Sequence, residues 1–498
     1  MNADELERFR ALFDPRGVIV AGVSSHPGKF GFVAAHNILS HDYPHPVFMT
    51  NRDGADVLGH ATYADLSRVP DGSADLVFVC TPAAANPDIL RQCASKGVKA
   101  AFVASAGYGE AGPDGRAAQD DLVRLCEELG MLLAGPNGQG VISTPSSLCA
   151  QIVAPYPPPG RIGIASQSGN FVSSFLNYAG WSGVGVSRAV SAGNSAATTV
   201  ADYLAYFAAD PETGVGLTYV EGIDDGRAFY EDMRAVAEAI PLVVVKGGAT
   251  AGGARAAASH TGSLAADDTV FDGVCRQAGI SRAPTIEEAF EAAMAFATQP
   301  PPRGPNVFVL TTAGGWGVVT ADRITRSPDL ELMALPADLE AQIDAELPPR
   351  WSRNNPADMA GGETRDTVPA LLEIVTAHPD VDAVVFLGLG IQSNQGRMER
   401  DGRFYPDFGL ERIVSYHERQ DVRFAEAAVR AADRHDKPVL VATELAVTQP
   451  DNPGVARLRE LGRPAFASSY RAVAALEHMW RRSRWRHRRG LDPDPPGT

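Results

Sequence analysis

The sequence of 498 residues contains few cysteines and no apolar run long enough to cross a bilayer. Its five cysteines are spaced singly, which argues against a disulfide framework and a paired-cysteine zinc site, so no metal site is predicted. The net charge of −16 disfavours a nucleic-acid-binding surface over most of the molecule. The N-terminal segment is acidic where a secretory signal needs basic and apolar stretches. We therefore expect a cytoplasmic protein that binds neither membrane nor nucleic acid.

One basic segment, WRRSRWRHRRG (480–490), departs from this acidic composition. Its arginines and two tryptophans would suit RNA, an acidic partner or an anionic lipid surface. A solvated last helix followed by a frayed tail explains the same residues more simply, and this is the interpretation that we favour.

The length exceeds what one hydrophobic core usually supports, so several domains are expected. Two proline-rich segments, APYPPPGR (154–161) and QPPPRGPN (299–306), predict boundaries that give domains over 1–153, 154–300 and 301–498. Each domain contains apolar, β-branched runs followed by small-residue turns and helical patterns, which is typical of parallel α/β sheets. The polar, irregular stretch from 391 to 421 is expected to form a long surface excursion.

The expected strands are short and almost continuously apolar, as in sheets that helices cover on both faces. They lie within residues 17–25, 45–51, 74–82, 99–107, 131–137, 161–170, 183–193, 214–222, 240–248, 306–317, 381–390 and 437–445.

Three small-residue turns follow expected strands, at the carboxyl edge where parallel sheets bind ligands and where helix starts favour anions. The first, GVSSHPGKFG (22–31), departs from the usual dinucleotide glycine spacing, and a structural bend is equally consistent with it. The second, SQSGN (166–170), suits either a helix cap or an oxyanion cradle. The third, TTAGGWG (311–317), has more glycine ahead of its expected helix than a cap requires. Together the last two suggest a shared anion site.

A single histidine, His260, lies in the sterically small segment ARAAASHTGSLA (254–265). A histidine with an ordinary pKa of about 6.5 presents a free ring nitrogen at neutral pH, and that nitrogen can attack phosphorus. A carboxylate that holds the other ring nitrogen improves such a nucleophile, and Glu221 in GLTYVEG is the best placed candidate. Most solitary histidines are structural or solvated, but the hydroxyl groups, glycine and anion turns nearby favour a chemical role here.

The histidine segment, with VVVKGG before it and DDTVFDGVCRQAGI after it, resembles the phosphohistidine segment of the NDP-forming acyl-CoA synthetases, which include succinyl-CoA synthetase. FDPRGVIVAGVSS, MTNRDG, VCTPA, SAGYGEAG and GPNGQGVIS resemble the CoA-binding domain of that superfamily; GIASQSGN, SAGNSAATTVADYL and DPETGVGLTYVEGI resemble its ligase domain. TTAGGWGVVTADRI, NNPADMAGG and VDAVVFLGLG resemble a third domain, found in the α subunit of ADP-forming enzymes. The resemblance implies a Rossmann-like CoA-binding domain followed by two flavodoxin-like ligase domains.

The resemblance further implies an acid–thiol ligase that works in three steps. Phosphate attacks an acyl-CoA, a histidine takes the phosphoryl group from the acyl phosphate, and phosphohistidine phosphorylates ADP. By position His260 is the phosphorylated residue and Glu221 its orienting carboxylate. The three domains leave no room for an ATP-grasp module, so ADP or ATP and Mg²⁺ are expected on a separate ATP-grasp β subunit in a hetero-oligomer. Acyl-CoA, phosphate and an organic acid are the other expected ligands.

Two sets of binding residues follow from the same resemblance. Those implied for CoA are Gly22, Ser24, Ser25, Lys29, Arg52, Thr81, Pro82 and Glu110. Those implied for phosphate are Ser166, Gln167, Ser168, Gly169, Asn170, Gly314, Gly315, Trp316 and Gly317. The chain departs from the common pattern at Gly138, where members often have cysteine, and at Ala197, where they have a carboxylate.

Two other functions would explain part of the sequence. A CoA- or acyl-CoA-binding regulatory protein could keep the fold without turnover. An NAD(P)-dependent dehydrogenase built on the first domain leaves the histidine segment without a role.

Overall fold

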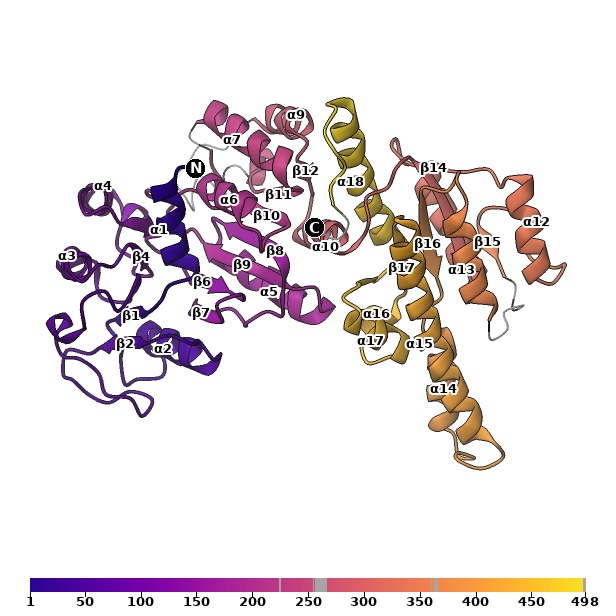
Figure 1. Cartoon of the computed structure of the whole chain (residues 1–498), viewed down its shortest axis with the longest axis horizontal. Helices are drawn as coiled ribbons and strands as arrows, with labels where there is room; N and C mark the ends of the chain where they lie inside the picture. Colours follow the sequence, from indigo (N-terminus) through magenta and orange to yellow (C-terminus); the bar gives the residue numbers. More distant parts are fainter. Residues whose placement is uncertain (224, 254, 256–266, 360, 362–365, 496–498) are drawn as a thin grey trace. The chain divides into compact units, whose positions relative to one another are not determined.

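The computed structural model describes residues 1–498 except 224, 254, 256–266, 360, 362–365 and 496–498 (Figure 1). The chain forms two compact units, one of Met1–Trp181 with Gly185–Ala289 and one of Ser182–Val184 with Phe290–Thr498. Within the described residues, no helix has the length and apolar character needed to span a membrane. The three domains predicted from the proline-rich segments stay a prediction, and each of the three contributes a sheet.

The first sheet has five parallel strands in the order β2-β1-β3-β4-β5. Their bounds are β1 Val18–Ala21, β2 Val47–Thr50, β3 Leu76–Val79, β4 Ala100–Val103 and β5 Leu132–Ala134. The helices of this region are α1 Ala3–Phe13, α2 Phe30–Ser40, α3 Asn86–Ser95 and α4 Pro113–Glu128, with short 3₁₀ turns at Leu66–Arg68, Ala83–Ala85 and Gly109–Ala111. Alternate residues of the central strands enter two cores, one with α1 and α2 and one with α3 and α4. This two-sided burial is why the strands are apolar along their whole length.

The second sheet has seven strands in the order β12-β11-β10-β8-β9-β6-β7. Strands β8 Pro159–Ser166, β9 Val186–Ser191, β10 Val215–Val220, β11 Leu242–Lys246 and β12 Ser281–Arg282 are parallel. Strands β6 Gly140–Ser143 and β7 Leu148–Gln151 extend the sheet beyond β9 as an antiparallel hairpin that the sequence did not predict. Its helices are α5 Gly169–Ser182, α6 Val200–Ala209, α7 Gly226–Ala239, α9 Asp268–Ala278 and α10 Ile286–Thr298, the last of which crosses into the second unit.

The third sheet belongs to the second unit and has the order β14-β13-β16-β17-β18, with β15 paired to β13. Its strands are β13 Asn306–Thr311, β14 Glu331–Leu332, β15 Ala357–Asp358, β16 Ala383–Leu387, β17 Val439–Ala442 and β18 Ala465–Phe466. Its helices are α11 Gly314–Thr325, α12 Ala337–Glu346, α13 Thr367–Ala377, α14 Ile391–Arg400, α15 Leu410–His435, α16 Leu445–Thr448, α17 Pro453–Glu460 and α18 Ser469–Arg488.

All three sheets contain the same doubly wound arrangement. Numbered within each sheet, the parallel strands follow the order 2-1-3-4-5, with β1, β8 and β13 as the first strands. In this order the chain reverses direction across the sheet between the first and third strands, and a crevice opens at their carboxyl ends. The three crevices therefore lie between β1 and β3, between β8 and β10, and between β13 and β16. The expectation of three consecutive α/β domains with parallel-dominated sheets is confirmed.

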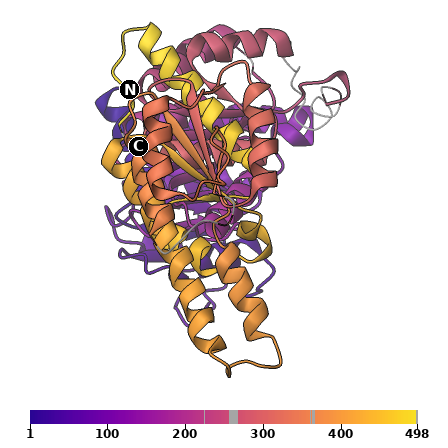
Figure 2. The same cartoon turned by 90° about the vertical axis from the view of Figure 1, so that its right-hand side faces the viewer.

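The stretch 391–421, predicted to be an irregular surface excursion, is helical instead. That stretch forms α14 and the first part of α15, which lie side by side as a helical hairpin that reaches beyond the third sheet (Figures 1 and 2). Val414 of α15 is buried, and so are the polar residues Ser393, Gln420 and Asp421, while most other polar residues of the stretch are exposed or partly exposed. Gly402, Pro406 and Gly409 lie between the two helices, whereas Gly396 is a buried residue inside α14.

The basic segment is also not a solvated, frayed end. It forms the last turns of α18, and Arg482 is buried in an ion pair with the buried Asp494, 2.6 Å from Nε to Oδ2. Arg481 and Arg484 both bind Asp329, at 2.5 Å and 2.6 Å. Carboxylates of the same unit therefore neutralise much of the charge that seemed available to an acidic ligand.

The cysteines behave as the sequence suggests. None of the five is in a disulfide, and burial raises the pKa of each thiol to about 12, so all stay uncharged at neutral pH; they are Cys80, Cys93, Cys126, Cys149 and Cys275. Among the residues that the structure describes, no group of three or more His, Cys, Asp or Glu side chains could hold a metal ion.

Candidate functional site

The crevice of the first sheet brings Gly22 and Thr81 into contact. Gly22 follows β1 with a φ of +86°, and a Cβ there would lie 2.6 Å from Thr81 Cγ2. In the first turn of α2, a Cβ on Gly31 would lie 2.2 Å from the carbonyl oxygen of Gly22. Both positions therefore require glycine, because α2 begins directly against the end of β1. This places backbone N–H groups of a helix start at the switch point, where an anionic group binds well.

Neighbouring residues that the resemblance implies for CoA line the same loops. Ser24 Oγ accepts a hydrogen bond from the His26 amide at 3.0 Å, and Ser25 and Lys29 are exposed ahead of α2. The Asn86 side-chain amide lies 2.8 Å from Thr81 Oγ1 and 2.8 Å from Tyr108 Oη, which fixes Thr81 after β3. Pro82 follows Thr81 and starts the Ala83–Ala85 turn. Whether this set binds CoA stays a prediction.

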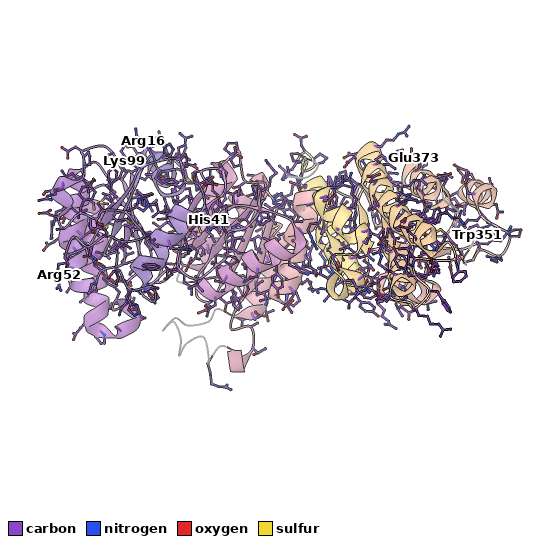
Figure 3. The ribbon with its side chains drawn as sticks, turned by 90° about the horizontal axis from the view of Figure 1, so that it is seen from below. Arg16, His41, Arg52, Lys99, Trp351 and Glu373 are labelled. Carbon is purple, nitrogen blue, oxygen red and sulfur yellow. The ribbon has the colours of Figure 1, made fainter. Side chains whose placement is uncertain are left out.

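Arg52 and Glu110 are arranged differently from each other. Figure 3 shows Arg16 and Lys99, which precede β1 and β4, together at one edge of the first sheet and Arg52, which follows β2, at the other. The Arg52 side chain is 96% exposed and lies 3.8 Å from Asp53, so it can move to meet a ligand.

Glu110, by contrast, is held by the protein. Its Oε1 accepts hydrogen bonds from the Gly107 and Tyr108 amides at 2.5 Å and 3.1 Å, and its Oε2 accepts one from Asn194 Nδ2 at 2.5 Å. Burial raises the pKa of this carboxyl, but the hydrogen bonds outweigh burial and lower the pKa overall. Asn194 follows β9 of the second sheet, so Glu110 links the loops of two sheets within one unit.

The crevice of the second sheet contains the turn Ser166–Asn170. Ser166, the last residue of β8, is fully buried; its Oγ donates to the Ser168 carbonyl at 2.8 Å and accepts from the Ser168 amide at 3.1 Å. Helix α5 then begins at Gly169. The turn thus delivers a helix start, with its unpaired N–H groups, at the carboxyl edge of the first strand in the sheet.

Gln167 connects this turn to Glu221. The Glu221 and Gly222 amides donate to Gln167 Oε1 at 2.6 Å and 3.3 Å, and Gln167 Nε2 donates to the Gly222 carbonyl at 3.2 Å. Glu221 follows β10, so one side chain ties the ends of the first and third strands together across the switch point. The backbone that bears the Glu221 carboxylate is therefore fixed beside the start of α5.

Tyr219 and Gly247 complete the surroundings of Glu221, and neither was among the predicted residues. Burial, together with the charge of Glu221 and a hydrogen bond to it, raises the pKa of Tyr219, which stays a neutral phenol. A Cβ on Gly247 would lie 2.4 Å from Tyr219 Oη and 3.4 Å from Glu221 Cγ. Strand alternation could have found Tyr219, because residues two apart on a strand face the same side. His260 lies outside the described residues.

Gln139 is a further residue that the sequence did not single out. It lies in the turn Gly135–Gln139 between β5 and β6, and its amide group covers Gly169: a Cβ there would lie 2.3 Å from Gln139 Cδ. Gln139 Nε2 donates to Asn170 Oδ1 at 3.2 Å. No sequence signal pointed to this contact, because it depends on β6 joining the second sheet beside β9.

The crevice of the third sheet repeats the strand-end pattern of Ser166. Thr311 is fully buried, and its Oγ1 donates to the Ala313 carbonyl and accepts from the Ala313 amide, both at 2.9 Å. The glycines were expected ahead of the helix; instead Gly314, Gly315, Trp316 and Gly317 form the first turn of α11. A Cβ on Gly314 would lie 2.4 Å from Asp358 Oδ2, so a carboxylate lies against this helix start.

Gly138 and Ala197 have separate surroundings. A Cβ on Gly138 would lie 2.7 Å from Phe102 Cζ and 2.7 Å from the Ser191 carbonyl oxygen. Phe102 therefore fills the space that a larger residue at position 138 would need. Ala197 is exposed and lines a cavity of about 300 Å³ with residues of α1, α4, β5 and α6.

Comparison with known proteins agrees with this geometry. Residues 16–144 match a CoA binding domain, residues 159–296 a succinyl-CoA ligase like flavodoxin domain, and residues 307–391 a ligase-CoA domain. The α subunit of acetate–CoA ligase [ADP-forming] I from Pyrococcus furiosus is 32% identical over 96% of this chain and 98% of its own length. This chain belongs to the ADP-forming acyl-CoA synthetases.

Two further members of this synthetase family bear on the assignment. Acetate–CoA ligase [ADP-forming] I from Archaeoglobus fulgidus is 34% identical over 75% of this chain, which spans only 54% of that protein. The dinucleotide-forming acetyl-coenzyme A synthetase 1 of Ca. Korarchaeum cryptofilum, solved with phosphate and ADP, is 29% identical, with a TM-score of 0.82 over 98% of this chain and 99% of that one. The chain is an ADP-forming acid–thiol ligase with CoA as a substrate.

Proposed function

We propose that this synthetase chain is an α subunit that transfers a phosphoryl group from an acyl phosphate to ADP by way of His260. An inorganic phosphate oxygen attacks the thioester carbon, the C–S bond breaks, and CoA leaves as the thiolate. A ring nitrogen of His260 then attacks phosphorus, the bond to the acyl oxygen breaks, and the acid leaves as a carboxylate. Finally the terminal oxygen of ADP attacks phosphorus, the N–P bond breaks, and ATP forms.

Glu221 is the residue that we assign to orient His260. A carboxylate that accepts a hydrogen bond from the N–H of one ring nitrogen fixes the tautomer and stabilises the ring as the other nitrogen takes the phosphoryl group. The single observation that supports this proposal is the clamp of Gln167 on the backbone of Glu221 and Gly222, which holds that backbone next to the turn that starts α5. The residues Ser166–Asn170 would hold the phosphate there through helix N–H groups.

The remaining predicted residues would bind CoA and a second phosphoryl group. The loops that contain Gly22, Thr81 and Arg52 would hold CoA at the carboxyl edge of the first sheet. The first turn of α11, at Gly314–Gly317, would form a second phosphoryl cradle in the other unit. Asp358 beside Gly314 would weaken anion binding there, because like charges repel at short distance.

A separate subunit would supply the nucleotide site. The Pyrococcus furiosus relative is named as a subunit alpha, and relatives such as the Archaeoglobus fulgidus ligase extend well beyond the region that this chain matches. We infer an ATP-grasp partner that binds ADP or ATP with Mg²⁺ in a hetero-oligomer.

The test is a comparison of His260→Ala with the unmodified chain, each reconstituted with an ATP-grasp partner. The variant should lose ADP phosphorylation and keep its CoA dissociation constant within about twofold, because His260 lies far along the chain from the loops of the first sheet that are proposed to hold CoA. Retained ADP phosphorylation would contradict the proposal. Joint loss of turnover and CoA binding would also count against it, since His260 is not expected to touch CoA.

A further inference from the structure

Gln139 lies where the CoA-binding sheet meets the phosphate turn. The turn Gly135–Gln139 leaves the carboxyl edge of the first sheet after β5, and the Asn137 amide donates to the Ser105 carbonyl after β4 at 3.1 Å. The Gln139 amide donates to Ser191 Oγ at 3.1 Å, which ties the same turn to β9 of the second sheet. One short segment therefore bridges the carboxyl edges of both sheets within a single compact unit.

This position matters for the acyl group. If CoA is held by the loops of the first sheet and phosphate by the start of α5, the thioester carbon must meet phosphate between them. The Gln139 side chain covers Gly169, the first residue of α5, and so borders this meeting point. A side chain there contacts the acyl group during the first chemical step.

Within the described residues, only one of the two polar atoms of the Gln139 carboxamide has a hydrogen-bond partner. Its Nε2 donates to Asn170 Oδ1 at 3.2 Å, whereas its Oε1 is buried and has no hydrogen-bond donor within the described structure. A buried acceptor without a partner is destabilising, so a ligand that supplies a donor is favoured over one that does not.

We propose that Gln139 selects acyl groups that carry a hydrogen-bond donor, such as a hydroxyl group, close to the thioester. This inference rests on the proposed function, because it needs CoA and phosphate at the two sheet edges. The donor would bind Gln139 Oε1 while Nε2 stays on Asn170. An apolar acyl group of the same size leaves Oε1 unsatisfied and binds less tightly.

The experiment measures dissociation constants of matched acyl-CoA pairs for the full chain, for example 3-hydroxybutyryl-CoA against butyryl-CoA and lactoyl-CoA against propionyl-CoA. At least one hydroxylated thioester should bind about tenfold more tightly than its apolar partner. Gln139→Leu should remove that preference by weakening only the hydroxylated thioester. Gln92→Leu, at an exposed position on α3, is the matched control and should change neither constant.

The outcomes separate this inference from the proposed function. Equal binding of every pair by the unmodified chain overturns the role of Gln139 but leaves the synthetase assignment intact. A preference that survives in Gln139→Leu overturns it as well. If neither CoA nor any thioester binds, the proposed placement of CoA fails. If Gln139→Leu does not fold, the dissociation constants of the acyl-CoA pairs for the unmodified chain still test the proposed preference.

Discussion

In the second and third sheets, the first strand ends in the same backbone turn, but the charged side chains near that turn differ. Ser166 and Thr311 end those strands as buried hydroxyls with the same pair of backbone bonds, and a helix begins three residues later in both. The next residue donates its amide to the neighbouring strand end in both sheets, Gln167 to Tyr219 and Thr312 to Leu387. This shared geometry follows from one strand order and one type of turn.

The side chains around the two turns are what distinguish them. In the second sheet Gln167 clamps the segment that contains Glu221, and the amides of Gln139 and Asn170 surround the start of α5. In the third sheet the equivalent strand β16 is followed by glycine: a Cβ on Gly388 would lie 1.9 Å from Thr312 Oγ1. A carboxyl side chain, that of Glu221, therefore follows the third parallel strand of the second sheet but not that of the third sheet, where Asp358 instead lies directly against the helix start. The comparison suggests that one fold presents a reactive anion site and a weaker, secondary one.

The largest expected effect tests the carboxylate that only the second sheet has. Glu221→Gln should slow formation of phosphohistidine about a hundredfold or more, because it removes the charge that stabilises the histidine cation. Rapid-quench measurement with acyl-CoA and phosphate gives this rate. The control is Glu231→Gln on α7, an exposed carboxylate paired with Arg227, which should leave the rate unchanged. An undiminished rate in Glu221→Gln would remove this residue from the mechanism.

The next effect concerns how the third sheet is held together. Burial raises the pKa of Asp329, but its bonds to Arg481 and Arg484 lower it overall. A carboxyl with a lowered pKa stabilises the fold above its ordinary pKa of about 4, and this stability is lost as the pH falls through the folded-state pKa. Asp329→Asn should lower the free energy of unfolding by about 2 kcal/mol at neutral pH. Denaturant titrations should also show a weaker loss of stability in acid for the variant; an unchanged acid profile would contradict the account.

A smaller effect concerns the packing beneath the turn of the second sheet. Gly138→Cys, which introduces the residue common in the family, should destabilise the chain by about 1–2 kcal/mol, because its Cβ meets Phe102 and the Ser191 carbonyl. Adding Phe102→Leu should restore part of the loss in thermal unfolding. If Gly138→Cys leaves the stability unchanged, Phe102 does not fill the space as described.

The smallest effect tests the charge at the third sheet. Asp358→Asn should tighten binding of inorganic phosphate at the start of α11 by about threefold, because it removes a negative charge from a helix N-terminus. Titration followed by NMR of the labelled protein would report it. Weaker phosphate binding in the variant would show that Asp358 supports the anion rather than repelling it.

The sequence predicted the central strands of each sheet better than the elements at the edges of the sheets. The twelve expected strands are continuous apolar runs because helices cover both faces of each sheet. Eleven lie within their expected ranges, and β8 begins two residues before its range, at Pro159. Strands β6 and β7 were missed because they are short, include Ser143 and Gln151, and pair antiparallel at one end of a sheet. Helix α14 and the first part of α15 were missed because they contain few apolar residues, and their contact buries polar side chains such as Ser393, Gln420 and Asp421.

In the candidate site, too, local features of the chain were easier to predict than contacts between distant segments. Gly22, Thr81, Ser166 and Glu221 were singled out because each lies at the end of a strand or within two residues after it, which is a local property of the chain. Gln139 and Asp358 were not found, because each meets its helix start only after distant strands pair. The arginines of α18 were misread since Asp329 and Asp494, which neutralise them, lie in other segments.

The most direct measurement uses radioactive inorganic phosphate, an acyl-CoA and this chain, followed by digestion and mapping of the label. The account predicts acid-labile, alkali-stable phosphate on His260, with free CoA released in equal amount. Label on any other residue, or release of CoA with no label on a chain shown to be folded, would contradict it.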